Sequence, residues 1–97
     1  LVVDGAIESL HLRKVCTVIS QQPAEVEKYI VRNLKRSATI SYGYGAYSGK
    51  RVTVLMSVLS TREAMKLRLF VRKIDPGAFI TIVNSSEIIG KGFRDMN

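Results

Sequence analysis

Apolar and polar positions alternate along the chain with a period that changes several times, and these changes predict strands and helices. Runs rich in β-branched residues predict strands, whereas apolar residues spaced three or four apart predict helices. Helical spacing occurs at Val26, Ile30 and Leu34 and again over residues 67–74. We therefore predict, in chain order, a strand over residues 13–20, a helix over 21–36, a strand over 38–40, a strand over 51–59, a helix over 62–74 and a strand over 78–83.

Residues at the helix ends support these boundaries. Pro23 suits a first helical turn, because the N–H that it lacks would be unpaired there in any case. Ser60 and Glu63 have the S-x-x-E spacing of a capping box, in which hydroxyl and carboxylate each satisfy an unpaired backbone N–H. Asp75 precedes Pro76, and a residue before proline is disfavoured in helical geometry. The second helix is therefore expected to follow Ser60 and to stop before Pro76.

The element order βαββαβ is typical of a ferredoxin-like α+β sandwich. In that fold a four-stranded antiparallel sheet carries both helices on one face, and the other face is left open; short extra strands at the termini are compatible with it. The strand over residues 51–59 is apolar on both faces, so we expect it to be central. We also expect the open face to be covered by further copies of the chain in a homo-oligomer.

Composition narrows the class of protein. Hydrophobic residues make up 46% of the 97 residues and charged residues 24%, a balance that excludes an intrinsically disordered chain. No apolar run approaches the roughly 18 residues of a membrane-spanning helix. The net charge of +7 favours an acidic partner such as a nucleic acid, a phosphate-bearing ligand or an anionic lipid. A basic solvated surface explains the charge equally well.

The titratable residues give little support to catalysis. His11 is the single histidine and the acidic residues are scattered, so no Ser/His/Asp set, paired carboxylates or metal-ligand spacing emerges. We therefore predict that the domain is not an enzyme and uses no cofactor or metal ion. Cys16 is the single cysteine and lies in an apolar run, which indicates a buried strand thiol in a reducing compartment.

The segment between the two middle strands carries the candidate binding chemistry. Residues 39–49 read T-I-S-Y-G-Y-G-A-Y-S-G, and the backbone N–H groups of a glycine-rich segment can converge on an anion. Basic side chains flank the segment, Arg36 before it and Lys50 and Arg51 after it, and they suit a phosphate or carboxylate. A hairpin loop that needs glycine for positive φ explains the same residues, so both interpretations stay open. The candidate ligand-binding residues are Arg36, Thr39, Gly43, Gly45, Ala46, Tyr47, Gly49, Lys50 and Lys91.

Two further groups of residues have alternative interpretations. Tyr42 and Tyr44 share one face of an extended chain and could stack on a base, but we favour an interface between subunits. A basic helix face could contact anionic lipid headgroups, although a solvated face is the simpler interpretation. No recognised nucleic-acid-binding motif is present. The residues of this basic face are Arg62, Lys66, Arg72 and Lys73.

Several short motifs, in this order along the chain, resemble those of a known family. They are Ile19-Ser20, Leu34 with Arg36 and Thr39, Gly43-x-Gly45-Ala46-Tyr47-Ser48-Gly49, Val58-x-Ser60-x-Arg62-Glu63, Ile74-Asp75-Pro76-x-Ala78-Phe79 and Gly90-x-Gly92-Phe93. Together they span roughly residues 10–93 and resemble the small C-terminal domain, of unknown function, of the YitT family of bacterial membrane proteins. Ser37 stands where the family usually has glycine, and Tyr44 takes a commonly charged position; both lie beside the candidate binding residues.

The resemblance implies an N-terminal bundle of membrane-spanning helices and a domain on the cytoplasmic face of the bacterial plasma membrane. Residues 1–12 would then be the lead-in connector from the membrane region, and residues 13–97 a single domain. The resemblance also implies a PII-like fold, typically a trimer, in which a glycine-bearing segment at subunit boundaries binds nucleotides or small anions. We accordingly expect a regulatory or ligand-sensing domain that binds a small anionic, nucleotide-like ligand between subunits. The alternatives are a purely structural oligomerisation domain and a domain that binds nucleic acid or an anionic membrane surface.

Overall fold

The elements of secondary structure follow one another in the predicted order. The computed structural model describes residues 13–85. Its elements are β1 (Arg13–Ile19), α2 (Pro23–Lys28), the π-helical turn η1 (Tyr29–Asn33), β2 (Thr39–Tyr44), β3 (Arg51–Leu59), α3 (Thr61–Ile74) and β4 (Phe79–Ser85). The predicted connector over residues 1–12, any extra strands at the termini and Lys91 lie outside the described residues.

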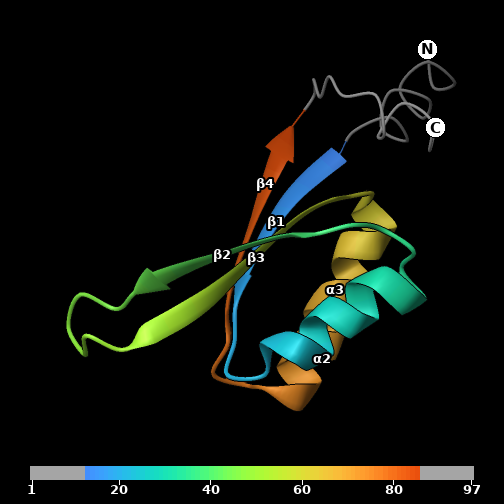
Figure 1. Ribbon diagram of the computed structural model, residues 1–97. Coiled ribbons are helices and arrows are strands. Elements are labelled where there is room, and N and C mark those ends of the chain that lie inside the picture. Colours follow the sequence, from blue (N-terminus) through green and yellow to red (C-terminus); the bar gives the residue numbers. More distant parts are fainter. Residues whose placement is uncertain (1–12, 86–97) are drawn as a thin grey trace, which may run out of the picture.

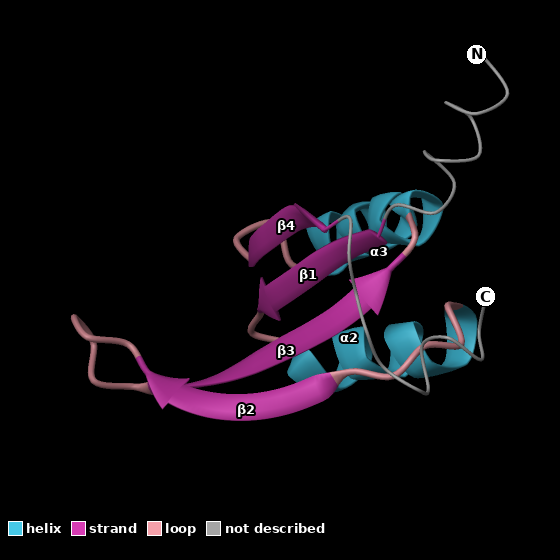
Figure 2. Ribbon diagram, turned by 90° about the horizontal axis from the view of Figure 1, so that it is seen from above, coloured by secondary structure: helices cyan, strands magenta, loops and turns pink. Residues whose placement is uncertain are grey.

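The strands form a four-stranded sheet in the order β2-β3-β1-β4, in which every neighbouring pair is antiparallel. α2 with η1, and α3, lie side by side on one face of this sheet (Figures 1 and 2). β3 is an inner strand, as its apolar residues on both faces indicate. The arrangement confirms the predicted ferredoxin-like α+β fold.

The hydrophobic core lies between the sheet and the two helices. In β1 and β3 every second residue points toward the helices, and the register places Val18 opposite Leu55 on this side. Each fully buried large aliphatic side chain stabilises the fold by roughly 1.5–3 kcal/mol, so this layer holds the helices on the sheet. The buried hydrophobic residues are Cys16, Val18, Val26, Ile30, Leu34, Leu55, Leu59, Ala64, Leu67 and Val71.

The first helix differs from the single helix predicted over residues 21–36. α2 begins at Pro23, but after Lys28 the backbone widens into η1, where the N–H of Leu34 donates to the carbonyl of Tyr29 at 3.1 Å. The apolar residues of this segment recur at steps of four, which exceed the 3.6 residues of an α-helical turn. A wider turn keeps residues at that spacing on the buried side, so the π-helical turn suits the sequence pattern.

Residues just beyond each helix stop it. Lys35 has a φ of 57°, a left-handed conformation that ends helices, so the first helix stops before the predicted Arg36. At the start of α3, Ser60 Oγ accepts from the N–H of Glu63 at 3.1 Å, and Glu63 Oε1 accepts from the N–H of Ser60 at 2.9 Å. The predicted capping box is therefore present, and α3 ends before Asp75 as predicted.

Candidate functional site

The sheet face turned away from the helices is rich in apolar side chains, and we call it the open face. Directly opposed residues of antiparallel strands share a face, so the register that pairs Val15 with Val58 and with Val83 assigns the whole face. Met56, Phe79 and Val83 are 41%, 65% and 53% exposed on it. The apolar residues of the open face are Val15, Ile19, Val52, Val54, Met56, Val58, Phe79 and Val83.

The open face is also almost free of charge. Its other positions in the four strands are Gly43, hydroxyl-bearing residues and Arg13. Arg13, at the start of β1, is its one charged residue within residues 13–85. Neither helix covers this side of the sheet (Figure 2). An apolar surface of this extent is typical of an interaction site.

Residues 39–44 of the glycine segment belong to β2, and residues 45–50 form the loop of the β2–β3 hairpin, which extends beyond the helices (Figures 1 and 2). Gly45 N–H donates to the Lys50 carbonyl and Gly49 N–H to the Gly45 carbonyl, both at 2.8 Å, while Lys50 N–H donates to Ser48 Oγ at 3.1 Å. These N–H groups therefore stabilise the loop itself and do not converge on a common point outside it. Gly49 has a φ of 72°, which favours glycine. The geometry supports the hairpin interpretation of the glycines.

A hollow of about 490 Å³ lies beside this loop. Three segments that are distant in sequence meet there: the turn after β1, the residues that open β3, and the turn between α3 and β4. Lys50 and Arg51 bring two cationic side chains to the hollow, and Asp75 brings a carboxylate. The lining residues are Ile19, Ser20, Gln21, Pro23, Ser48, Lys50, Arg51, Val52, Thr53, Asp75, Gly77 and Phe79.

Asp75 is fixed in the wall of the hollow by hydrogen bonds. Its Oδ2 accepts from the Gln21 N–H and from the Ser20 hydroxyl, each at 2.8 Å. The Gln21 N–H, then the Ser20 hydroxyl and a further bond from the Gly77 N–H, hold the pKa of Asp75 below its usual value of 3.8. Asp75 is therefore ionised at neutral pH, and it ties the turn after β1 to the end of α3.

The candidate binding residues fall into separate places. Lys50 lies at the hollow, and the loop residues Gly45, Ala46, Tyr47 and Gly49 form the hairpin tip next to it. Tyr47 is fully exposed. These loop residues and Lys50 are the part of the predicted site that the structure brings together.

The other candidates lie elsewhere. Thr39 is opposite Met56 and Gly43 is opposite Val52, which places both on the open face. Arg36 lies before β2, whose six residues separate it from the loop by about 20 Å of extended chain. It was expected to join Lys50 around an anion, but its Nε instead donates to both carboxylate oxygens of Glu63 at 3.0 and 3.1 Å.

Arg36 and Glu63 form a partly buried ion pair, with side chains 14% and 20% exposed. Burial raises the pKa of Glu63, but hydrogen bonds from the Ser60 N–H and from Arg36, with the charge of Arg36, outweigh burial and hold the pKa below its usual value of 4.5. The pair joins the segment after the first helix to the start of α3. Its role in the fold explains Arg36 without a ligand.

Sequence reasoning missed several residues of the hollow, among them Ser20 and Gln21, whereas Arg51 was expected beside Lys50 as a basic flank of the glycine segment and does line the hollow. The side chain of Arg51 lies over the ring of Tyr42, with 4.0 Å between its guanidinium carbon and the ring centroid. Tyr42 is 61% exposed and lies on the helix side of the hairpin, beyond the helices. The signal for Lys50 and Arg51 was their position directly after the glycine segment.

No helix within residues 13–85 is long and apolar enough to cross a membrane. In the same part of the chain, no three His, Cys, Asp or Glu residues lie close enough together to hold a metal ion.

The fold and its surfaces define an α+β domain in which helices cover one face of the sheet and the other, apolar face is open. Within this class, the chain belongs to the DUF2179 family, described as "Uncharacterized protein conserved in bacteria", whose model matches residues 36–90.

Several relatives of the chain are bacterial membrane proteins of the UPF0750 group. It is 31% identical over 96 residues to membrane protein YxkD of Bacillus subtilis, covering 99% of the chain and 34% of that protein. It is 26% identical over 88 residues to YitT of the same organism, covering 91% and 31%. A 35% match over 92 residues to an uncharacterized protein of Bacillus sp. strain PS3 covers 95% and 61%. The predicted resemblance to the YitT family is confirmed, and the chain spans about a third of the B. subtilis proteins.

Solved structures share the fold. A DUF2179 protein from Eubacterium ventriosum aligns with a TM-score of 0.63 at 21% identity, covering 73% of this chain and 97% of that one. A functionally unknown protein from Pediococcus pentosaceus aligns with a TM-score of 0.64 at 11% identity, covering 84% and 99%.

Proposed function

We propose that this chain is a self-associating regulatory domain of a bacterial membrane protein, and that copies of it assemble through the open face of the sheet. The carrying observation is the nearly uncharged open face, whose apolar side chains come from β1, β3 and β4. A membrane-spanning region of the same protein and a position on its cytoplasmic side belong to the proposal. The membrane-spanning region is supported by the membrane proteins of which this chain matches only a part.

The chemistry of the open face favours another copy of the same face as its occupant. Lipid headgroups and nucleic acid require cationic contacts, and Arg13 alone supplies charge there within the described strands. Two sheets, by contrast, pack face to face about 10 Å apart when their side chains interdigitate. Burial of this surface removes apolar area from water at about 25 cal/mol per Å², which drives association without a specific polar contact.

The test is the mass of the full 97-residue chain in solution, measured by sedimentation over a range of concentrations. The wild-type chain is expected to assemble. Two open faces packed on each other would give a dimer, and the trimer that the family resemblance implies would bring three open faces around one axis; either state supports the proposal. Val83→Glu, on the open face, should give a monomer because it would bury an unpaired carboxylate. Val31→Glu is the matched control, since Val31 is 50% exposed and Val83 53% exposed, and it should assemble like wild type. A monomeric wild-type chain, or equal loss of assembly in both variants, would overturn the proposal.

A second candidate function is the sensing of a small anion at the hollow beside the hairpin loop. It is favoured by the positions of Lys50 and Arg51 at one hollow together with the hydroxyl of Ser48. Charge-assisted hydrogen bonds to phosphate from such groups are stronger than neutral ones. A ligand at this point would order the hairpin loop and so alter the surface that the domain presents to the rest of its protein.

The probes for this function are ATP and inorganic phosphate, titrated into the full chain while amide NMR shifts are recorded. Binding should shift the amides of residues 48–53 and fail in Lys50→Gln. Lys66→Gln is the matched control, because Lys66 is exposed on α3 and does not line the hollow. Shifts that survive in Lys50→Gln, or no shifts with either probe, would reject this candidate and leave assembly as the function of the domain.

A further inference from the structure

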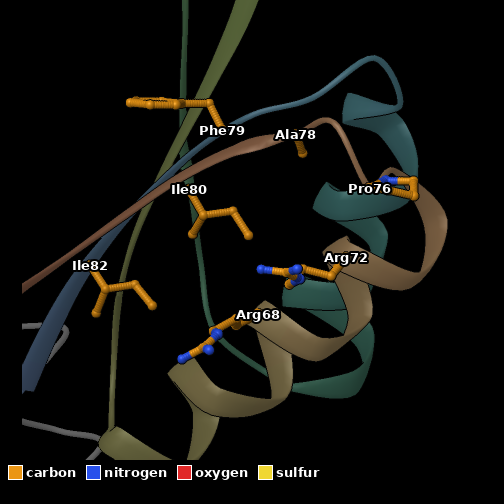
Figure 3. A pocket seen from close by; sticks show the side chains of 7 residues that line it. All are labelled: Arg68, Arg72, Pro76, Ala78, Phe79, Ile80 and Ile82. Carbon is orange, nitrogen blue, oxygen red and sulfur yellow. The ribbon is translucent and has the colours of Figure 1, made fainter.

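A second hollow, separate from the hairpin, lies between α3 and the edge strand β4 and has a volume of about 390 Å³. Two arginines of α3, Arg68 and Arg72, form one wall, and both guanidinium groups extend from the helix toward β4 (Figure 3). The residues that line this groove are Arg68, Arg72, Pro76, Ala78, Phe79, Ile80 and Ile82.

The two arginines have no counter-charge among the residues that the structure describes. Within residues 13–85, Arg36–Glu63 is the one ion pair between side chains, and neither Arg68 nor Arg72 has a hydrogen-bond partner. They stand four residues apart on α3, so they are neighbours on one helix flank, where like charges repel. An anion placed between them would remove that repulsion and accept several N–H bonds.

The opposite wall of the groove is apolar. Ile80 and Ile82 point to the helix side of β4, as their pairing with Val18 and Cys16 requires, but α3 leaves Ile82 38% exposed. Met65 lies three residues before Arg68 on the same flank and is 52% exposed, so the apolar surface continues past the arginines. The turn at Pro76 and Ala78 closes the other end (Figure 3).

We propose that this groove binds a single-chain anionic amphiphile, with its carboxylate or phosphate head held by Arg68 and Arg72 and its alkyl chain laid against Ile80 and Ile82. The arginine wall complements the anionic head of such a ligand, and the apolar β4 wall complements its alkyl chain. The volume lies in the range of small-molecule sites, roughly 300–1,000 Å³. This site goes beyond the proposed assembly and shares neither cation with the hollow at the hairpin.

The probe is sodium decanoate, used below its micelle concentration and titrated into the full chain with amide NMR shifts as the readout. Shifts are expected at Arg68, Arg72 and residues 78–82, and not at Lys50. Acetate, which has the head without the chain, should bind at least tenfold more weakly. Decyltrimethylammonium, which has the chain with the opposite charge, should not bind in the groove.

Variants test the arginines. Replacing both Arg68 and Arg72 with glutamine should weaken decanoate binding by at least tenfold, which corresponds to about 1.4 kcal/mol. Arg62→Gln combined with Lys73→Gln makes the same change in net charge on α3 outside the groove and should keep binding within a factor of two. Loss of binding in both double variants, or retention in both, would overturn the proposal.

A second arm separates a monomeric ligand from a lipid surface. Vesicles of phosphatidylglycerol and of phosphatidylcholine are compared with decanoate by co-sedimentation of the full chain. Binding to decanoate that depends on Arg68 and Arg72 supports the proposal, whatever the vesicles do. Arginine-dependent binding to phosphatidylglycerol vesicles without binding of decanoate would overturn it in favour of a membrane-contact surface. Neither outcome bears on assembly through the open face, so the two proposals fail independently.

Discussion

The ion pair between Arg36 and Glu63 is expected to stabilise the fold, and Arg36→Met removes it while keeping most of the volume of the side chain. The two side chains are 14% and 20% exposed, between a solvated pair, worth about 0–1 kcal/mol, and a buried pair, whose breaking costs about 3–5 kcal/mol. Glu63 keeps the hydrogen bond from the Ser60 N–H at 2.9 Å, so it is not left unpaired. We therefore expect a loss of about 2 kcal/mol, or roughly 8–16 °C in Tm for a domain of this size.

The effect of this variant should depend on pH with a definite sign. The pKa of Glu63 lies below its usual value of 4.5 in the folded chain, so the stabilisation is complete above the unfolded-state pKa and is lost as pH falls through the folded-state pKa. The difference in unfolding free energy between wild type and Arg36→Met should thus be full at pH 7 and shrink below about pH 4.

Urea unfolding at pH 7 and pH 3.5, at one protein concentration because assembly shifts apparent stability, measures both effects. Arg62→Met is the matched control, since Arg62 is exposed and adjoins Glu63 in sequence; it should change stability by less than about 0.5 kcal/mol. A double-mutant cycle with Glu63→Gln isolates the pair. A coupling energy near zero, or a loss from Arg36→Met that is the same at both pH values, would refute this account of Arg36.

Three further predictions concern the core, the hairpin and the thiol. Leu67→Ala, at a core position 1% exposed, should cost about 2–5 kcal/mol through lost burial and a cavity; a smaller change in the urea midpoint would contradict the packing described above. Gly49→Ala should cost about 1–2 kcal/mol because Gly49 has a φ of 72°, which disfavours alanine. Nothing lies within 4 Å of the added Cβ, so this cost contains no steric clash, and an unchanged Tm would show that the loop adopts another conformation. The Cys16 thiol, fully buried and with a pKa raised by burial to about 11, should resist a thiol-specific disulfide reagent at pH 8 and react only in urea. Rapid reaction of the folded chain would contradict its burial.

Much of the fold could be predicted because the signals lie close together in sequence. Ser60 and Glu63 are one helical turn apart, so their capping box could be identified without any long-range contact, and the same holds for the stop at Asp75 and Pro76. The order of apolar periods then allowed few arrangements, because one sheet face and one side of each helix must be buried together. The π-helical turn was missed, although Val26, Ile30 and Leu34 recur at steps of four residues, a spacing that a wider turn keeps on one side of the helix.

The candidate site was predicted less well, since it depends on residues far apart in the chain. Arg36 was assigned to an anion because it precedes the glycine segment, but its partner Glu63 is 27 residues away. The loop of the hairpin was identified from its glycines. The opposite wall of the hollow depends on the hydrogen bond from Ser20 to Asp75, two residues that are 55 positions apart in the sequence. No local sequence pattern predicts a contact between residues so far apart in the chain.

The sequence by itself determined the elements of this domain and their order, because periodicity and helix-end signals act within a few residues. It also determined that the sheet has a second apolar face, which the one layer of helices leaves uncovered. Only the tertiary structure decided where the charges lie. The register of β4 on β1 brings Ile80 and Ile82 under Arg68 and Arg72, and the entry to β2 brings Arg36 to Glu63. Both outcomes depend on how the helices pack across the sheet, which is set by the whole core and not by any one segment.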